Sequence, residues 1–427
     1  MKWIAIQPLT GGMYFGTENA TGNSAECIIS FKGLDQPVYN KQEELIDAKN
    51  EYNLLKYLDD HNRKPDYFLF ENLQMFDSPE LALTNSELVD TSDNAVEPNF
   101  NDIDLVVAVP ICSGLSTATQ ASKEKRATIN NNMVLITNYA LGKIRPKVYI
   151  FENAPGLSTG AGESTRKLLE DVAERFGYNV AYYKTNTSLH HNCQHRCRTF
   201  VYFFRQDFEK EGVPQINWED EHISVVDYLN NVPKDAEDHI YIPNNGMNDI
   251  IWDFVKHKFG NDWRTLCKGK DLFTPVLKQG LLDELDAYGK ENASEYTYEK
   301  LHKFIEHVKD KVAQNKGFWL DCYKTLKGDE TPAIMYKSIP NIIHPLEDRA
   351  LTIRECLALM GMPNDFRMAG RPECYFKKIG QNVPVRTAEF IVSQAKSIIE
   401  NWKNIPDMEL YPNKTLFNNI KQKIEHF

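Results

Sequence analysis

The stretch DLVVAVPICSGLS, residues 104–116, starts as an apolar run and ends in a proline, a cysteine and a small Ser-Gly pair. A continuous apolar run of this length is typical of a strand buried on both faces of a parallel sheet. A second run of this kind, KVYIFEN (147–153), carries Glu152 near its end. Since ligands bind beyond the carboxyl ends of strands in open α/β sheets, we expect Cys112 and Glu152 to face one crevice. The alternative is that Cys112 is only a small buried apolar residue.

Strand and helix patterns alternate on both sides of this stretch. The runs KWIAIQPL (2–9) and AECIISF (25–31) read as strands, and ESTRKLLEDVAERFG (163–177) reads as an amphipathic helix closed by Gly177. Apolar residues at helical spacing also predict a helix over 41–61. Repeated alternation predicts a doubly wound α/β fold with a mostly parallel sheet. From about residue 206 to 334 the pattern gives way to polar segments, which predict a smaller, separate domain.

Composition restricts the class of protein. The chain has 427 residues, of which 42% are hydrophobic, and a net charge of -11. No segment approaches the roughly 20 apolar residues that span a bilayer, and the first residues lack the long apolar segment of a secretory signal. We therefore expect an intracellular, cytoplasmic protein with no membrane partner. The eight cysteines are scattered along the chain, which favours reduced thiols over a disulfide framework.

Positively charged residues are concentrated close to Cys112 in the sequence, although the net charge of the chain is negative. Residues 116–150 hold six basic residues against the single acid Glu124, and residues 184–205 hold four basic residues and no acid. Local positive potential of this kind attracts a polyanion, because salt screens charges beyond about 8 Å. The alternative is that each segment is an ordinary solvated face.

Five motifs in order extend this interpretation: PICSGLS (110–116), FENAPGL (151–157), QHRCR (194–198), RALTIRECLALMGMPNDF (349–366) and IGQNVPV (379–385). In this order they resemble the cytosine-C5 DNA methyltransferase family. The resemblance implies a Rossmann-like catalytic domain formed by residues 1–205 and 335–427. It makes 206–334 an inserted target-recognition domain. It further implies S-adenosylmethionine as methyl donor and double-stranded DNA as partner, and we expect a monomer.

The resemblance also assigns roles to residues. Cys112 would add to C6 of a cytosine that is flipped out of the duplex, because C6 is inaccessible in a stacked base. Glu152 would hydrogen-bond N3 and the exocyclic amine. Arg198, and less directly Arg196, would hold the base carbonyl and the catalytic loop. The predicted DNA contacts, through phosphates, are Ser116, Lys123, Lys125 and Arg126.

The expected cofactor site departs most from the family pattern. Gln7 and Leu9 stand where relatives have an aromatic residue and a glycine, and Lys32 stands where they have an acid against the ribose hydroxyls. Asp35 could replace that acid if its loop is remodelled. The predicted cofactor contacts are Gly11, Gly12, Lys32, Asp35, Pro110, Gln381, Asn382 and Val383.

Three alternatives remain open at this point. The enzyme could use an altered methyl donor or another one-carbon source, with Lys32 meeting an added negative charge. It could be a DNA-binding relative that transfers nothing. The segment CYKT (322–325) also resembles, faintly, a signature of the tRNA-methylating branch, which would make RNA the substrate.

Two further segments have a structural interpretation. HHNCQHRC (190–197) has ligand types that suit zinc, but strand alternation would place its cysteines and His195 on the face opposite Arg196 and Arg198. We therefore expect no metal. Arg354 and Glu355 lie in a segment that predicts a structural helix, and we expect them to brace the interface between the two domains.

Overall fold

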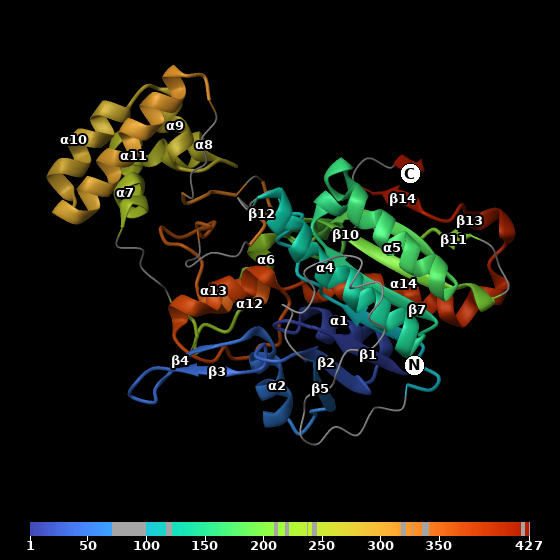
Figure 1. The fold of residues 1–427 in the computed structure, drawn as a ribbon. Helices are drawn as coiled ribbons and strands as arrows, with labels where there is room; N and C mark the ends of the chain where they lie inside the picture. Colours follow the sequence, from blue (N-terminus) through green and yellow to red (C-terminus); the bar gives the residue numbers. More distant parts are fainter. Residues whose placement is uncertain are drawn as a thin grey trace.

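The computed structural model describes residues 1–70, 100–116, 122–208, 212–217, 222–236, 238–240, 246–316, 322–326, 328–334, 341–419 and 423–426. Within these ranges a nine-stranded sheet has the order β15-β14-β8-β10-β7-β6-β1-β2-β5 (Figure 1). Its strands are β1 (Trp3–Ile6), β2 (Cys27–Phe31), β5 (Asp66–Phe70), β6 (Leu105–Ala108), β7 (Val148–Asn153), β8 (Tyr178–Asn186), β10 (Cys197–Arg205), β14 (Thr415–Asn418) and β15 (Lys423–His426).

The sheet is mostly parallel, as the sequence predicts. β1 pairs in parallel with β2 and β6, and β6 pairs in parallel with β7. β10 runs antiparallel between β7 and β8, and β15 runs antiparallel to β14. Because β10 is reversed, its first residues lie at the edge where β6 and β7 end.

Three short strand pairs lie outside the main sheet. They are β3 (Pro37–Tyr39) with β4 (Leu45–Ala48), β9 (Gln194–His195) with β12 (Thr331–Pro332), and β11 (Val213–Pro214) with β13 (Leu410–Tyr411).

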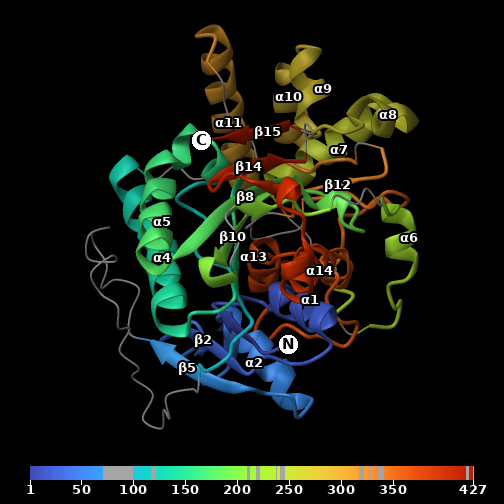
Figure 2. The ribbon, with the colours of Figure 1, turned by 90° about the vertical axis from the view of Figure 1, so that its right-hand side faces the viewer.

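Helices cover both faces of the main sheet (Figure 2). One face packs against α1 (Gly12–Thr21), α2 (Asn50–Asp60), α12 (Ile353–Leu359), α13 (Pro372–Gln381) and α14 (Val385–Asn401). The other face packs against α4 (Lys123–Tyr139) and α5 (Glu163–Phe176). Along β6, Val107 enters the first core, whereas Val106 and Ala108 enter the second. Side chains that alternate between two buried faces explain why this strand is apolar throughout.

A group of helices stands beside the sheet and has its own core (Figure 1). It contains α7 (Met247–Phe259), α8 (Trp263–Cys267), α9 (Phe273–Lys278), α10 (Leu282–Asn292) and α11 (Glu295–Ala313). Their buried side chains, such as Trp252, Trp263 and Leu301, pack together. The preceding helix α6 (Val225–Asn230) instead packs Val225 and Leu229 into the core against the sheet. The division at residues 206 and 334 stays a prediction.

The helix predicted over 41–61 is wrong in its first half. The structure forms the β3–β4 hairpin there, and α2 begins only at Asn50. The turn places Glu43 at φ 61, and the Asn40 side chain accepts hydrogen bonds from the backbone of Gln42 and Glu44. Such local turn chemistry overrides apolar spacing, because the three-residue step from Leu45 to Ala48 does not by itself establish a helix.

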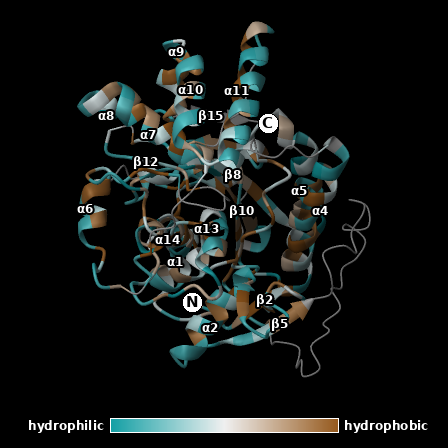
Figure 3. Ribbon diagram, turned by 90° about the vertical axis from the view of Figure 1, so that its left-hand side faces the viewer, coloured by the Kyte–Doolittle hydropathy of each residue, from teal (hydrophilic) through white to brown (hydrophobic). Residues whose placement is uncertain are grey.

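Figure 3 shows hydrophobic and hydrophilic residues mixed along α4, α5 and α11, as expected for helices with one packed face. No helix in the described ranges is both long enough and apolar enough to cross a membrane.

Candidate active site

The ends of three strands bring Cys112, Glu152 and Arg198 to one edge of the sheet. Cys112 follows β6, Glu152 is the penultimate residue of β7, and Arg198 is the second residue of the reversed strand β10. The register fixes this arrangement, since Thr199 of β10 lies opposite Asn153 of β7. Arg198 Nε and Glu152 Oε1 form an ion pair at 2.5 Å, with the side chains 17% and 2% exposed, respectively.

The thiol of Cys112 lies within the electrostatic field of this pair. Burial raises the pKa of Cys112, and the charge of Glu152 raises it further, whereas Arg198 and Arg196 lower it. Desolvation disfavours the thiolate, and neighbouring guanidinium groups favour it. Burial therefore favours the neutral thiol, and two guanidinium groups are in place to stabilise the thiolate.

Arg196 supports the site through hydrogen bonds to two distant backbone carbonyl groups. It is buried and donates hydrogen bonds through Nη1 to the carbonyls of Ile334 at 2.7 Å and Gly380 at 3.0 Å. Burial, and then the charge of Arg198, lower the pKa of Arg196 to about 9. Arg196 thus joins β10 to segments far away in the sequence, and Arg198 is the arginine that contacts Glu152.

Two asparagines that the sequence analysis missed hold the cysteine loop. The backbone N–H of Ile111 donates to Oδ1 of Asn132 on α4, at 2.9 Å. Asn153 Nδ2 donates to the carbonyl of Pro110 at 3.5 Å, and its Oδ1 accepts from the backbone of Ala154 at 2.9 Å. The signal for Asn153 was its position next to Glu152, whereas nothing in the sequence marked Asn132.

Gly12 and the segment after α13 meet in close contact. The N–H of Gly12 donates to Asn382 Oδ1 at 2.7 Å, and a Cβ added at Gly12 would lie 1.8 Å from the carbonyl oxygen of Val383. The neighbouring Gly11 has φ 111, a left-handed conformation that favours glycine. The predicted residues Gly11, Gly12, Asn382 and Val383 are therefore brought together, although their contact with a cofactor stays a prediction.

We expect Gly12→Ala to lower the free energy of unfolding by about 1–3 kcal/mol, because the added methyl group must displace backbone. Urea unfolding followed by circular dichroism measures this change. Gly160→Ala is the matched control, since a Cβ there meets no atom within 4 Å. Equal stability of the two variants would contradict the close contact at Gly12.

The other predicted cofactor residues differ in burial and in their contacts. Pro110 is buried at the end of β6, and Gln381 accepts a hydrogen bond from Asn50 at 2.9 Å through its Oε1. Lys32 is exposed, and no hydrogen bond or ion pair of Lys32 is found in the described part of the chain. Asp35 lies instead near Glu51, a buried residue of α2 that the sequence analysis did not single out.

The predicted DNA-binding residues lie around the cysteine loop and the start of α4. Ser116 ends the described part of that loop, and residues 117–121 lie outside the described residues. Lys123 begins α4, followed by the exposed Lys125 and the half-buried Arg126. Ser122 caps this helix by accepting the backbone N–H of Lys125 at 3.3 Å. The cap fixes the residue at which α4 begins. The basic first turns of α4 therefore have a defined position beside the cysteine loop.

The segment rich in histidine and cysteine is only partly buried, with His195 exposed to solvent. His190 is buried and stacks on Phe390 with ring centroids 4.4 Å apart, and Cys193 is also buried. Burial lowers the pKa of His190 to about 3, which keeps the ring neutral. Across the described ranges, no three His, Cys, Asp or Glu side chains form a group able to hold a metal ion.

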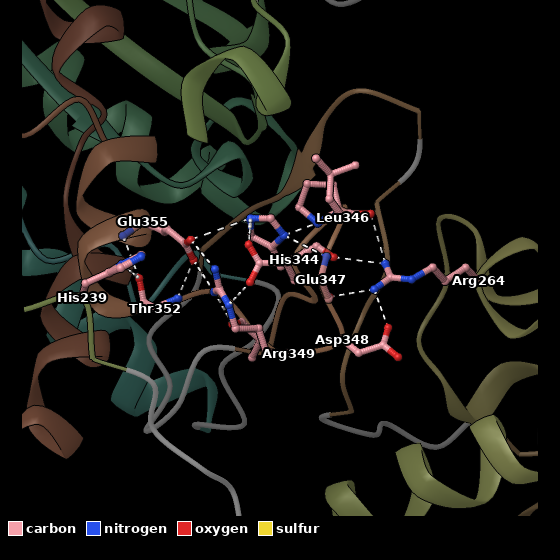
Figure 4. A network of polar contacts seen from close by, with 11 residues as sticks. His239, Arg264, His344, Leu346, Glu347, Asp348, Arg349, Thr352 and Glu355 are labelled. Carbon is pink, nitrogen blue, oxygen red and sulfur yellow. Dashed lines mark hydrogen bonds and ion pairs between the residues drawn. The ribbon is translucent and has the colours of Figure 1, made fainter. Parts of the chain in front are cut away.

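A polar network joins the helical group to the start of α12 (Figure 4). Arg349 makes a bidentate contact with Glu355, with both N–O distances 2.8 Å. Arg264 of α8 donates to the carbonyls of His344 and Glu347 and to the carboxylate of Asp348. The network borders a cavity of about 480 Å³.

Arg354, which precedes Glu355 in α12, anchors the loop after this helix. Arg354 is fully buried, donates to the carbonyl of Phe366 at 2.9 Å and lies 3.2 Å from Asp238. Glu355 faces the network through Arg349, whereas Arg354 faces the opposite loop. Their bracing role stays a prediction, and these contacts support it.

A mostly parallel sheet with β10 reversed between β7 and β8, and a cysteine, glutamate and arginine at its carboxyl edge, define a Rossmann-like methyltransferase. Residues 82–397 match the model of the family described as C-5 cytosine-specific DNA methylase. Because this match covers most of the sequence, the chain belongs to that family. It is a DNA cytosine methyltransferase, and the family implies S-adenosylmethionine as donor and DNA as substrate.

Curated relatives and solved structures agree with this membership. The chain is 25% identical over 346 residues to the type II methyltransferase M.XorII of Xanthomonas oryzae pv. oryzae, covering 75% of each chain. It is 23% identical over 352 residues to the type II methyltransferase M.Bpa9945I of Bacillus paralicheniformis, covering 74% of this chain and 76% of the relative.

Among solved structures, a DNA modification methyltransferase encoded within an E. coli prophage aligns with a TM-score of 0.54 and 14% identity, covering 94% of this chain and 99% of the other. The Entamoeba histolytica methyltransferase EhMeth aligns with a TM-score of 0.50 and 12% identity, covering 95% of this chain and 99% of the other. At these identities the alignments establish the fold alone.

Proposed function

We propose that this protein transfers a methyl group from S-adenosylmethionine to C5 of a flipped-out cytosine in double-stranded DNA, through a covalent bond between Cys112 and C6. The observation that carries the proposal is the Glu152–Arg198 ion pair beside the Cys112 thiol at the carboxyl edge of the sheet. A nucleophile, a hydrogen-bonding carboxyl group and a fixed cation are the groups that this reaction requires.

Cys112 acts as the nucleophile. The thiol gives its proton to solvent as the sulfur forms a bond to C6. The electron pair of the C5–C6 double bond then shifts to C4–C5 and N3 takes a proton, so C5 becomes the nucleophilic carbon of an enamine. The donor, when bound, supplies an electrophilic methyl group. After C5 has gained the methyl group and N3 has lost its added proton, a solvent base takes the proton of C5 and the sulfur leaves C6, which restores the C5–C6 double bond. Arg198 and Arg196 favour the thiolate at the first and last of these steps.

Glu152 activates and orients the base. One carboxyl oxygen accepts a hydrogen bond from the exocyclic amine, and a proton shared between the other oxygen and N3 draws electron density away from C6. Arg198 fixes the carboxyl group by holding Oε1 at 2.5 Å. Because Arg198 already holds the Glu152 side chain, that side chain loses little conformational freedom when the base binds.

The residues near the ends of β1 and β2 fit the donor. Gly12 lets the segment of Asn382 and Val383 pack closely against the loop after β1, and Glu51 is a buried acid of α2 next to that loop. The alternative of a negatively charged donor has less support, because Lys32 is exposed and the acid Asp35 lies in the same loop.

The proposed function is tested by incubating duplex DNA with the purified protein and S-adenosylmethionine, followed by nucleoside mass spectrometry. We expect 5-methylcytosine at a single sequence context. A cytosine with a different added mass would support an altered donor. Modification of RNA but not of duplex DNA would favour an RNA substrate, and no modification of either would contradict the proposal.

Affinity for DNA should decrease steeply with salt, although the chain is acidic overall, because the proposed contacts are made to phosphates. Replacing Lys123, Lys125 and Arg126 with glutamine should weaken binding to every sequence and reduce the slope of log affinity against log salt by up to about 3. Fluorescence anisotropy at several salt concentrations measures the slope.

The control for this experiment replaces three exposed lysines elsewhere, Lys56, Lys64 and Lys403, so that the change in net charge is the same. Equal slopes in the two triple variants would show that the start of α4 does not contact phosphates.

A further inference from the structure

Three consecutive asparagines, Asn130, Asn131 and Asn132, lie within α4 with buried side chains. Asparagine is a poor helix former, and its polar side chain is usually exposed. A buried amide also costs free energy unless it is hydrogen-bonded. A row of such residues inside a helix therefore indicates that their polar atoms have a role other than helix stability.

Two of these asparagines contact the loop that carries Cys112. Asn132 Oδ1 accepts the backbone N–H of Ile111, the residue before the cysteine, at 2.9 Å. Asn130 lies against Gly114, because a Cβ added at Gly114 would be 2.1 Å from Asn130 Oδ1. The loop therefore contacts α4 on each side of the cysteine.

Other elements hold the two ends of the same loop. Asn153 Nδ2 donates to the carbonyl of Pro110 at 3.5 Å. At the other end, the helical turn Pro155–Ser158 packs closely, since a Cβ added at Gly156 would lie 2.3 Å from the carbonyl oxygen of Leu115. The contacts that remain for the middle of the loop are those with α4.

The two asparagines are only partly satisfied by their neighbours. Asn130 Nδ2 donates to Thr165 Oγ1 of α5 at 3.3 Å. Asn130 Oδ1 and Asn132 Nδ2 are buried and have no hydrogen-bond partner within the described residues. The next residues of the helix, Met133 and Val134, are buried and apolar, as a helix selected for stability alone would be. Residues that lower stability in this way are expected where a functional group must be placed.

We propose that Asn130 and Asn132 are positioning residues that fix where the Cys112 thiol lies in the site. Asn132 holds the peptide that leads into the cysteine, and Asn130 supports Gly114 two residues beyond it. Both act through the backbone of the loop and not by contact with the base. The inference rests on the proposed function, because it assigns a role in the reaction of Cys112. Misplacement of a reacting group by about 1 Å can lower a rate by roughly 10²-fold, so such contacts matter.

The first test compares Asn132→Ala with Asn132→Asp. Alanine removes the acceptor for the Ile111 N–H but favours the helix, so α4 should still form. Aspartate is nearly isosteric and keeps an acceptor oxygen, and burial favours its neutral form. We expect single-turnover methyl transfer from S-adenosylmethionine to duplex DNA to fall by about 10-fold or more with alanine, and to return to within about 3-fold of wild type with aspartate. The Kd for DNA should stay within about 3-fold in both variants, because the basic first turns of α4 are unchanged.

The contact itself is measured by amide hydrogen exchange of a peptide that spans residues 110–116. This experiment needs neither DNA nor donor. Loss of the hydrogen bond should speed exchange at Ile111 by about 10-fold in Asn132→Ala, and Asn132→Asp should restore the protection.

Gly114→Ala and Asn130→Ala test the second contact. Gly114 does not have a left-handed φ, so alanine meets strain there only through its neighbours on α4. Its methyl group must displace the loop from Asn130 and from the backbone oxygen of Arg126, which would lie 2.7 Å away. We expect each variant to lower methyl transfer by about 10-fold, with little change in the Kd for DNA. Full activity in both variants would overturn the role of Asn130.

The control is Asn138→Ala, which removes another buried asparagine of α4, about 9 Å further along the helix axis. If this variant lowers methyl transfer as much as Asn132→Ala does, a general loss of stability explains the effect and the inference is overturned. Unchanged transfer in Asn132→Ala overturns it as well, and so does a loss that Asn132→Asp fails to recover although exchange is restored. If the wild type itself transfers no methyl group, the proposed function fails, and the inference fails with it.

Discussion

A Cys112→Ala variant will bind target DNA but will form no covalent complex with it and will transfer no methyl group. Removing a nucleophile typically reduces the rate by a factor of roughly 10³ or more. The substitution deletes one sulfur atom from a half-buried site, so the fold and the basic surface that binds DNA remain. The loss should therefore appear in catalysis and not in affinity.

The measurement uses duplex DNA with 5-fluorocytosine at the target position, in the presence of S-adenosylmethionine. Fluorine cannot leave C5 as a proton does, so the wild type should be trapped as a complex that survives denaturing electrophoresis. Cys374→Ala is the matched control, because Cys374 is also a partly exposed free thiol but lies on α13. Trapping that survives in Cys112→Ala would identify another residue as the nucleophile.

The strands at the centre of the sheet could be predicted from the sequence because their signal is strong and local. The run at 105–108 is apolar on both faces, as only a strand between two helical layers needs to be. The run at 148–153 is similar and ends in polar residues that belong to the site. Fold class and the position of Cys112 and Glu152 follow from these two strands.

The sequence could not supply the pairing between distant residues. The contact of Arg198 with Glu152 depends on the reversed direction of β10, which no local pattern encodes. The burial of Glu51 could not be predicted from the sequence either. An acid in the first turn of a helix usually faces solvent, where its negative charge interacts favourably with the helix N-terminus. Only the packing of α2 against β2 shows that this carboxyl group is buried.

The resemblance to a family placed the donor contacts at Lys32 and Asp35 because it aligned positions along one strand. In the structure Lys32 points to solvent, whereas Asp35 faces Glu51. An alignment compares positions along the chain, and it does not show which side chains lie close together in space. The donor contacts of Lys32 and Asp35 stay predictions.

Removing Arg198 alone should destabilise the protein more than removing Arg198 together with the charge of Glu152. Arg198→Met leaves the Glu152 carboxylate, 2% exposed, without its ion-pair partner. Breaking a buried pair in this way costs about 3–5 kcal/mol, because an uncompensated charge stays in the interior. The double variant Arg198→Met/Glu152→Gln removes that charge and should recover much of the stability.

Activity should follow a different pattern from stability. Both variants lose the group that holds the carboxyl in place, and the double variant also loses the carboxyl group itself, so we expect methyl transfer to fall by roughly 10²-fold or more in each. Chemical unfolding gives the stability, and single-turnover methyl transfer gives the rate. A stable but inactive double variant would show that the pair is retained for catalysis at a cost in stability.

The control for this pair is Lys56→Met, which breaks an exposed ion pair with Asp60 at 2.6 Å. Exposed pairs contribute about 0–1 kcal/mol, because water screens the charges. If Arg198→Met costs no more than Lys56→Met, Glu152 is compensated by other groups. If the double variant is less stable than Arg198→Met, the carboxylate stabilises the fold without Arg198. Either result would contradict the assignment of Arg198 as the residue that holds Glu152 ready for the base.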